Sequence, residues 1–210
     1  GGHVIWVDAE QSWMNSWAQT NGVDPERVTV VNDTRIENVA DAVADLALYF
    51  RSQLTHNEPI LLVIDSVAAM DCADNIDSKM TDAKAEMGGR AKALYKYFRI
   101  RSELFYRLGV TQIYINQLRT ALNVGFGKDN TTTTGGAALK FYASIRAAFY
   151  SGRSITVKQK GKERKAGKLV TVRLIKNKVA PPRPTISKCP VYFNPKFHEV
   201  GFDRCFGLED

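Results

Sequence analysis

Glu10, Asp65 and Gln117 each stand at the end of an apolar, strand-like run of the sequence. These runs are residues 1–8, 59–65 and 113–115, and the last of them is predicted to be a buried strand. Open parallel sheets bind their ligands at the carboxyl ends of the strands, and in nucleoside triphosphatases an acidic residue there holds the Mg²⁺ that bridges the terminal phosphates. Asp65 alone is a weak signal, because many α/β strands end in Asp. With Glu10 and Gln117 on neighbouring strands, it predicts a site for a magnesium-bound nucleotide.

A long polar segment, residues 118–136, follows Gln117. It is rich in Gly, Thr, Asn, Asp, Lys and Arg, so we expect no fixed strand or helix within it. Loops of this length inside a compact domain are usually functional. Cationic side chains, hydroxyls and bare glycine N–H groups suit a phosphate backbone, and an aromatic ring suits a base. The candidate DNA-binding residues of this loop are Arg119, Phe126, Lys128, Thr132, Thr133, Gly135 and Gly136.

The elements that would position these residues follow from periodicity. Strands are predicted at the three apolar runs and at 27–31, a short helix at 12–22, and a short helix leading into a strand over 137–146. A covering helix is predicted from residue 36, with Asp33-Thr34 as its N-cap, and a second helix over 87–108. The core face of the second helix is predicted to be Met87, Ala91, Leu94, Phe98, Phe105 and Leu108. Together these elements predict an α/β fold with a mostly parallel central sheet flanked by helices.

Basic residues are concentrated in the later part of the chain. Between Arg153 and Lys178 there are ten Lys or Arg and one Glu, and this segment accounts for the excess behind the net charge of +7. Segments 154–157 and 169–175 alternate like paired strands around the turn sequence KGKERKAGK, and one more strand is expected over 185–193. The charge predicts a nucleic-acid surface, and the alternative is a solvated hairpin tip.

Composition sets the outer limits. With 210 residues and 44% hydrophobic content, the chain can form one domain, which we expect over residues 1–193, followed by a partly ordered tail at 194–210. No apolar run approaches membrane-spanning length and no signal peptide is visible, so no membrane partner is expected. The three cysteines lack metal-ligand spacing and favour a reducing, cytoplasmic location.

Several motifs together resemble the RecA family of homologous-recombination ATPases. The sequence INQLR, the Gly-Phe-Gly at 125–127, the threonine cluster and GGAALKFYASIR are similar to the second DNA-binding loop of that family and its flanks. Four further matches follow the family's order: DAE at 8–10, DSVAAM at 65–70, a first DNA-binding loop at 71–86, and KNK at 176–178. The resemblance implies a RecA-like P-loop NTPase core with a C-terminal β-hairpin extension.

The resemblance also implies roles at a nucleotide site for ATP and Mg²⁺. Glu10 would polarise the water that attacks the γ-phosphate; alternatively, it is a helix-start carboxylate favoured by the macrodipole. Asp65 would hold Mg²⁺ through water with Ser66 beside it, and Gln117 would sense the γ-phosphate. Other members of the implied site are Trp17 and Tyr192 at the base, and Lys176 and Lys178, which would reach the nucleotide of the neighbouring subunit.

One position departs from the family pattern at the base. Met14 stands where bacterial relatives have an Asp that bonds adenine, and Asn15 is the nearest substitute. On the DNA side, the resemblance implies that Lys92 and Arg99 approach DNA. The implied activity is ATP-dependent filament formation on single-stranded DNA by a homo-oligomer, followed by strand exchange with a homologous duplex.

The phosphate-binding motif G-x-x-x-x-G-K-[ST] is absent from the sequence; the nearest imitation, 161–168, has the wrong spacing. We therefore expect the chain to be part of a longer parent protein with a phosphate loop upstream, and to be inactive alone. The alternatives are a catalytically silent DNA-binding or filament-modulating paralogue and a RecA-fold replicative helicase. Retention of Glu10, Asp65, Gln117 and the KNK lysines favours the recombinase over the silent paralogue.

Overall fold

The computed structural model describes residues 1–78, 88–120, 131–181 and 185–203. Its chain forms two compact units, Gly1–Gln19 with Val23–Tyr142, and Thr20–Gly22 with Ala143–Asp210. Within the described residues, no helix is both long enough and apolar enough to span a bilayer.

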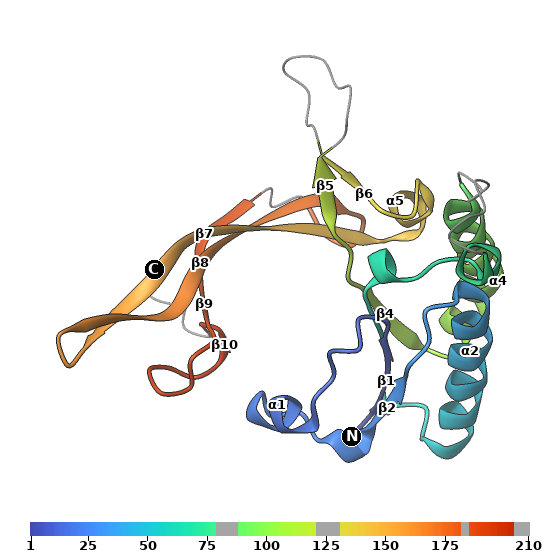
Figure 1. Ribbon diagram of the computed structural model, residues 1–210. Helices are drawn as coiled ribbons and strands as arrows, with labels where there is room; N and C mark the ends of the chain where they lie inside the picture. Colours follow the sequence, from blue (N-terminus) through green and yellow to red (C-terminus); the bar gives the residue numbers. More distant parts are fainter. Residues whose placement is uncertain (79–87, 121–130, 182–184, 204–210) are drawn as a thin grey trace. The chain divides into compact units, whose positions relative to one another are not determined.

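The first unit is built on a parallel four-stranded sheet, in agreement with the α/β prediction (Figure 1). Its order is β2-β1-β3-β4, with β1 at His3–Asp8, β2 at Val28–Val31, β3 at Ile60–Asp65 and β4 at Val110–Tyr114. The register pairs Asp8 with Asp65 and Ile64 with Tyr114. Since all four strands run the same way, their carboxyl ends meet at one edge, where the polar residues predicted from the sequence follow them.

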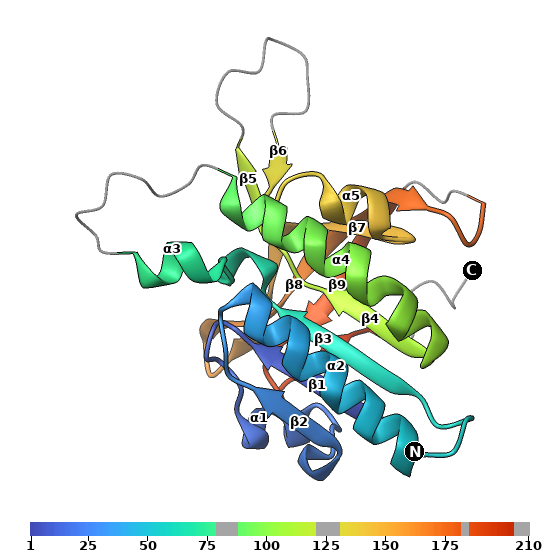
Figure 2. The ribbon, with the colours of Figure 1, turned by 90° about the vertical axis from the view of Figure 1, so that its right-hand side faces the viewer.

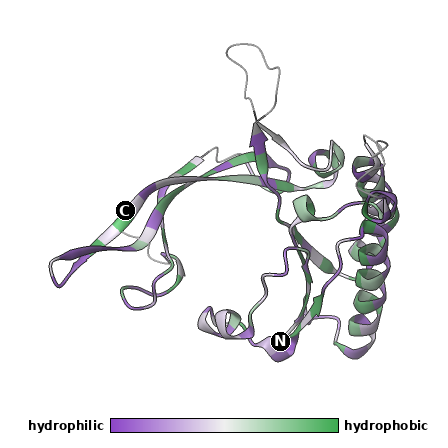
Figure 3. Ribbon diagram, viewed as in Figure 1, coloured by the Kyte–Doolittle hydropathy of each residue, from purple (hydrophilic) through white to green (hydrophobic). Residues whose placement is uncertain are grey.

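Two long helices, α2 (Ile36–Gln53) and α4 (Gly89–Arg107), cover one face of this sheet (Figures 1 and 2). Hydrophobic and hydrophilic residues alternate along both helices, as expected for helices that bury one side (Figure 3). Burying a large apolar side chain completely stabilises the fold by about 1.5–3 kcal/mol. The largest fully buried apolar side chains include Ile5, Ile60, Leu62, Ile64, Leu94 and Phe105.

The predicted start of α2 is displaced. Arg35, not Asp33 or Thr34, is the N-cap residue, and it makes no side-chain cap hydrogen bond. The Asp33 carboxylate instead accepts a hydrogen bond from the Arg35 N–H at 2.8 Å. The reason is tertiary: the Ile36 N–H donates to the Asp71 carbonyl at 3.0 Å, so a neighbouring segment satisfies the end of the helix.

The prediction that Ile113 and Ile115 are buried was wrong. Ile113 is 48% exposed and Ile115 is 40% exposed, although Val110 at the start of β4 is buried. Side chains alternate between the two faces of a strand, and α2 and α4 cover only one face of this sheet. Tyr114 points to the covered face, so Ile113 points to the other one.

The long polar loop was predicted to lack regular structure, and at its two ends this was wrong. Strands β5 (Leu118–Thr120) and β6 (Thr131–Thr133) pair antiparallel, with Leu118 opposite Thr133. β-branched threonines favour extended pairing, which the polarity of the segment concealed. After β6, the short helix α5 (Ala138–Tyr142) forms as predicted.

Two shorter helices complete the first unit. The predicted helix before Asn21-Gly22 is α1 (Asn15–Thr20). Helix α3 (Ala73–Asp77) lies within 71–86, the segment that resembles a first DNA-binding loop. Short 3-10 turns occur at Pro25–Arg27 and Val67–Ala69.

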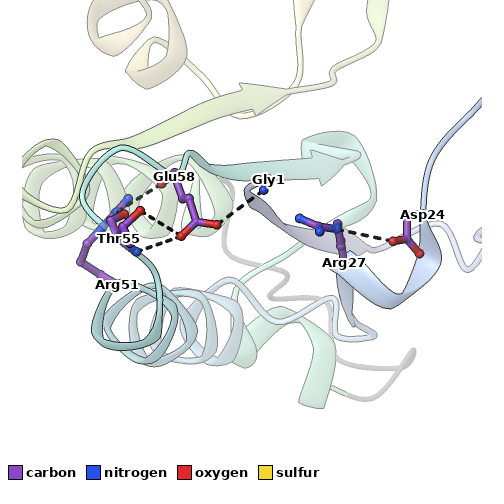
Figure 4. A network of polar contacts seen from close by, with 6 residues as sticks. All are labelled: Gly1, Asp24, Arg27, Arg51, Thr55 and Glu58. Carbon is purple, nitrogen blue, oxygen red and sulfur yellow. Dashed lines mark hydrogen bonds and ion pairs between the residues drawn. The ribbon is translucent and has the colours of Figure 1, made fainter.

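At the amino end of the sheet, hydrogen bonds among Arg51, Thr55 and Glu58 stabilise the turn between α2 and β3 (Figure 4). Glu58 Oε2 accepts hydrogen bonds from the Thr55 N–H and hydroxyl, both at 3.0 Å, and these bonds lower the pKa of Glu58. Arg51 Nη1 donates to the carbonyls of Thr55 and Glu58. This network lies at the opposite end of β3 from Asp65, so it supports the sheet away from the candidate site.

The second unit is an antiparallel sheet of order β10-β9-β8-β7. Its strands are β7 (Ile145–Gln159), β8 (Lys162–Asn177), β9 (Thr185–Tyr192) and β10 (Gly201–Phe202). The sequence placed the β7–β8 turn over KGKERKAGK, which was too long. Lys160 and Gly161 alone make the turn, with φ of 50° and 74°, as a two-residue type I′ hairpin turn requires. The segment expected as a partly ordered tail includes β10, and residues 204–210 lie outside the described part.

Candidate functional site

The carboxyl ends of β1 and β3 bring Glu10 and Ser66 into contact. The N–H groups of Ala9 and Glu10 both donate to the Asp65 carbonyl, at 2.9 and 3.3 Å, so the chain leaving β1 turns over the end of β3. The Ser66 hydroxyl donates to Glu10 Oε1 at 2.5 Å, and the peptide bond between Asp65 and Ser66 is cis. The Glu10 carboxylate is thereby held above the end of the sheet.

Gln117 reaches the same carboxylate from β4. The chain beyond Tyr114 stays paired with β3, because Ile115 N–H donates to the Ile64 carbonyl at 3.0 Å and Val67 N–H donates to the Ile115 carbonyl at 2.9 Å. The Gln117 side-chain amide then donates to Glu10 Oε1 at 3.4 Å. Residues that follow β3 and β4, Ser66 and Gln117, thus both contact Glu10 Oε1, which follows β1. The contact between Glu10 and Gln117 agrees with their expected positions at neighbouring strand ends.

Negative charge is concentrated at this edge. Burial raises the pKa of Asp65, and the nearby carboxylates of Glu10 and Asp8 raise it further. A cation beside Asp65 would relieve this repulsion. No group of three or more His, Cys, Asp or Glu in the described ranges is arranged to hold a metal ion directly. A single carboxylate nevertheless fits Mg²⁺, which keeps several waters and takes its other ligands from phosphate oxygens.

Sequence reasoning missed the role of Asp8. Its buried carboxylate accepts hydrogen bonds from the N–H groups of Ser12 and Trp13, both at 2.9 Å, and so fixes the loop that leads into α1. Asp side chains commonly accept hydrogen bonds from the backbone of the turn that follows them, which could have suggested this contact. Asp8 is therefore occupied with this loop, and Asp65 remains the candidate carboxylate for a cation.

The candidate base-binding surface lies on α1 and the loop before it. Trp17 is 46% exposed and Met14 is 61% exposed, which leaves both side chains accessible. Asn15 is not a free substitute for the missing Asp, because its side-chain carbonyl already accepts the Trp13 indole N–H at 2.7 Å. Residues 14 and 15 therefore offer no carboxylate to a base amino group, and the Asn15 carbonyl has only its second lone pair to offer.

The candidate DNA surface includes a cavity of about 490 Å³ between α4 and the start of α5. Its lining residues are Ala91, Lys92, Tyr95, Lys96, Arg99, Ala137 and Ala138. Gly135 and Gly136 adjoin it: a Cβ on Gly135 would lie 2.5 Å from Leu94 Cδ1, and one on Gly136 3.0 Å from Ala91 Cβ. Both glycines have positive φ, so other residues would be strained as well as crowded there.

The two candidate sites are joined through one short segment. Asn116, next to Gln117, donates its side-chain N–H to the Thr134 carbonyl at 2.9 Å, directly before Gly135. Arg119 on β5 is paired in register with Thr132 on β6. The Thr133 hydroxyl is buried without a hydrogen-bond partner in the described part of the chain. Phe126 and Lys128 lie outside the described residues.

The remaining predicted site residues belong to the second unit. Lys176 pairs in register with Arg146, and its pKa is lowered by partial burial, then by the charges of Lys178 and Arg146. Lys178 N–H donates to the Ser144 carbonyl at 3.0 Å. The Tyr192 ring stacks on His198, with centroids 3.9 Å apart. The expected contacts of Lys176, Lys178 and Tyr192 with nucleotide remain predictions.

The β7–β8 hairpin carries the basic segment found in the sequence. Lys158 pairs with Glu163, and Val157 with Arg164, so cations occupy both faces of the ribbon. The exposed cations of its outer part are Arg153, Lys158, Lys160, Lys162, Arg164, Lys165 and Lys168. Contact of these charges with nucleic acid remains a prediction, and the alternative is a solvated hairpin tip.

A model of the RecA N-terminal domain matches residues 1–194. The chain belongs to the RecA family. The resemblance found in the sequence motifs is thereby confirmed. The RecA protein of Bacteroides thetaiotaomicron is 36% identical over 208 residues, and that of a Picosynechococcus species is 34% identical over 202 residues. These alignments cover 99% and 96% of this chain but 54% of each relative, so the chain spans about half the length of the curated relatives it matches.

Proposed function

We propose that these residues belong to a DNA-dependent ATPase that forms filaments on single-stranded DNA and promotes strand exchange with a homologous duplex. The observation that carries the proposal is the convergence of Ser66 and Gln117 on the Glu10 carboxylate. Asn116, the neighbour of Gln117, also donates a hydrogen bond to the Thr134 carbonyl, directly before the glycines that adjoin the basic cavity. A residue suited to sense a γ-phosphate is therefore linked by one hydrogen bond to a surface suited to DNA.

Residues of this chain have distinct roles in the proposed ATP hydrolysis. Bound MgATP supplies the terminal phosphate that is transferred to water and a cation that neutralises its charge. Asp65 would hold the cation, and Glu10 would orient the attacking water and accept its proton. Gln117 would exchange its contact with Glu10 for one with the γ-phosphate and so act on Asn116, which contacts Thr134. Lys176 and Lys178 act on the nucleotide of a neighbouring subunit.

We further propose that a phosphate loop, which is not among these 210 residues, completes the site in the longer parent protein. Backbone N–H groups of such a loop hold the phosphates, and its Lys neutralises them. The 210 residues alone are then expected to show no ATP turnover. DNA binding and ATP hydrolysis are therefore to be measured in the parent protein.

DNA binding gives the direct test of this function. Arg119→Ala is expected to weaken single-strand binding and to flatten the log–log salt dependence of the binding constant by about one unit or less, as for the loss of one phosphate contact. Fluorescence anisotropy with labelled oligonucleotides across a salt series measures both quantities. Affinity should depend little on base sequence, because phosphate contacts do not distinguish bases.

Arg107→Ala is the matched control for Arg119. Arg107 is exposed at the end of α4 and pairs with Glu103 on the same helix, so its loss should leave the salt slope unchanged. If Arg119→Ala leaves binding intact while neutralising the β7–β8 hairpin abolishes it, the loop is not the principal DNA contact. That result would move the assignment to the basic hairpin.

Base selectivity should be weak. Because Met14 is only a weak acceptor and the Asn15 carbonyl already accepts from Trp13, ATP and GTP are expected to differ by at most about 10²-fold in kcat/KM, against 10⁴ or more for a site built to bond the base. Met14→Asp should increase the preference for ATP, whereas Met14→Leu should not. Strong discrimination by the unmodified protein would show that another group recognises the base.

A further inference from the structure

A chain of hydroxyl groups joins α4 to β4 inside the first unit. The Tyr97 hydroxyl on α4 lies 3.1 Å from the Tyr114 hydroxyl, and the Tyr114 hydroxyl donates to Gln112 Oε1 at 2.6 Å. A phenol has one proton to donate. Since Tyr114 gives its proton to Gln112, Tyr97 must donate to Tyr114. The three groups therefore form one directed chain from the helix to the strand.

Tyr97 is buried, and Tyr114 and Gln112 are partly buried. Tyr97 is 5% exposed, and burial raises the pKa of both tyrosines, so both stay neutral donors at any physiological pH. A buried hydroxyl that loses its partner is strongly disfavoured, so the three groups fix each other's separation. Phe98 packs against Tyr114 at 5.0 Å and stacks on Tyr142 of α5 at 5.3 Å, which encloses the chain in aromatic rings.

Two members of the chain, Tyr114 and Tyr97, each lie close in sequence to one of the two candidate sites. Tyr114 lies three residues before Gln117, whose amide contacts Glu10. Tyr97 follows Lys96 and precedes Arg99, both of which line the basic cavity on the other side of α4. A displacement of the end of β4 is therefore transferred to the helix that bears the cavity cations, because the hydroxyl chain resists slippage between them.

We propose that Tyr97 and Tyr114 are positioning residues that couple the nucleotide state at Gln117 to the DNA-facing side of α4. This inference rests on the proposed function. It adds a second connection to the one through Asn116 and Thr134, which runs through the loop rather than through the helix. Neither tyrosine needs to touch nucleotide or DNA. Their effect is on the energetic coupling between the two sites.

The test measures this coupling. In the parent protein, the affinity for a labelled oligothymidylate is determined with and without a non-hydrolysable ATP analogue, and the ratio of the two affinities is the coupling factor, commonly about 5–150. Tyr114→Phe and Tyr97→Phe are each expected to reduce this ratio by roughly threefold or more, while affinity without nucleotide stays within about twofold. Tyr114→Phe should have the larger effect, because it leaves both Tyr97 and Gln112 unpartnered.

Controls separate coupling from a structural role. Tyr106→Phe on the same helix is the matched control, because Tyr106 is exposed, and the ratio should not change. The double variant Tyr97→Phe/Tyr114→Phe should be no worse than Tyr114→Phe alone, since both belong to one chain. Thermal unfolding checks that each variant is folded.

The outcomes distinguish the inference from the function on which it rests. An unchanged ratio in folded Tyr97→Phe and Tyr114→Phe overturns the coupling role and leaves the ATPase proposal standing. An equal loss of DNA affinity with and without nucleotide also overturns it, in favour of simple packing. If the unmodified protein binds DNA equally with and without nucleotide, the proposed function fails, and the coupling role fails with it.

Discussion

Replacing Lys176 or Lys178 by Ala in the parent protein is expected to reduce DNA-stimulated ATP hydrolysis by about 10³-fold, the effect typical of losing a cation that acts on a neighbour's phosphate. The electrostatics support this expectation. Partial burial, Lys178 and Arg146 all lower the pKa of Lys176, so positive charge is concentrated around it. A terminal phosphate would offset this charge. Steady-state turnover with saturating single-stranded DNA measures the loss.

Mixed filaments test whether the lysines act across a subunit boundary. Subunits with Lys176→Ala lack one side of each interface, and subunits with Glu10→Gln lack the other, so a mixture should contain some intact interfaces and recover part of the activity. Lys196→Ala, at an exposed position to which no nucleotide or DNA contact is assigned, is the matched control and should keep full turnover. Absence of recovery in mixtures shown by light scattering to co-assemble would rule out action in trans.

The parallel sheet could be predicted because its signals are local. Runs such as 59–65 are apolar nearly throughout, as expected of a central strand, and each is followed by a polar residue at the end where ligands bind. Features that depend on partners were not predictable in this way. Ile113 has the composition of a buried residue, yet it faces away from both covering helices. The extended pairing of β5 with β6 depends on contacts across the loop.

The candidate site also combines residues that local sequence signals predict with residues whose roles depend on distant partners. Glu10, Asp65 and Gln117 could be predicted to lie together, because strand ends in a parallel sheet share an edge. Tyr97 was not in the predicted core face of its helix, and its partner Tyr114 is far away in sequence, so no periodicity could reveal their bond. Asp8 was hidden for another reason: its carboxylate resembles a ligand in the sequence but is used by the loop before α1.

Glu10→Gln in the parent protein is expected to lower kcat by about 10²–10⁴-fold, the range for loss of a general base, while ATP affinity changes little. The substitution suits this purpose because it keeps the shape of the side chain. The Gln carbonyl can still accept from the Ser66 hydroxyl and the Gln117 amide, which both contact Glu10 Oε1. What is lost is the negative charge that takes a proton from water. Single-turnover hydrolysis and binding of a fluorescent ATP analogue measure the two effects separately.

Ser66→Ala is the matched comparison for Glu10→Gln, because it removes one hydrogen bond to the carboxylate and leaves the base in place. Its effect on kcat should therefore be smaller than that of Glu10→Gln. Loss of ATP affinity with little change in kcat would give Glu10 a structural role at the start of the loop to α1. If the unmodified parent protein hydrolyses no ATP with or without DNA, the silent DNA-binding paralogue is the better account, since the contacts of Glu10 would then hold the sheet edge together without performing chemistry.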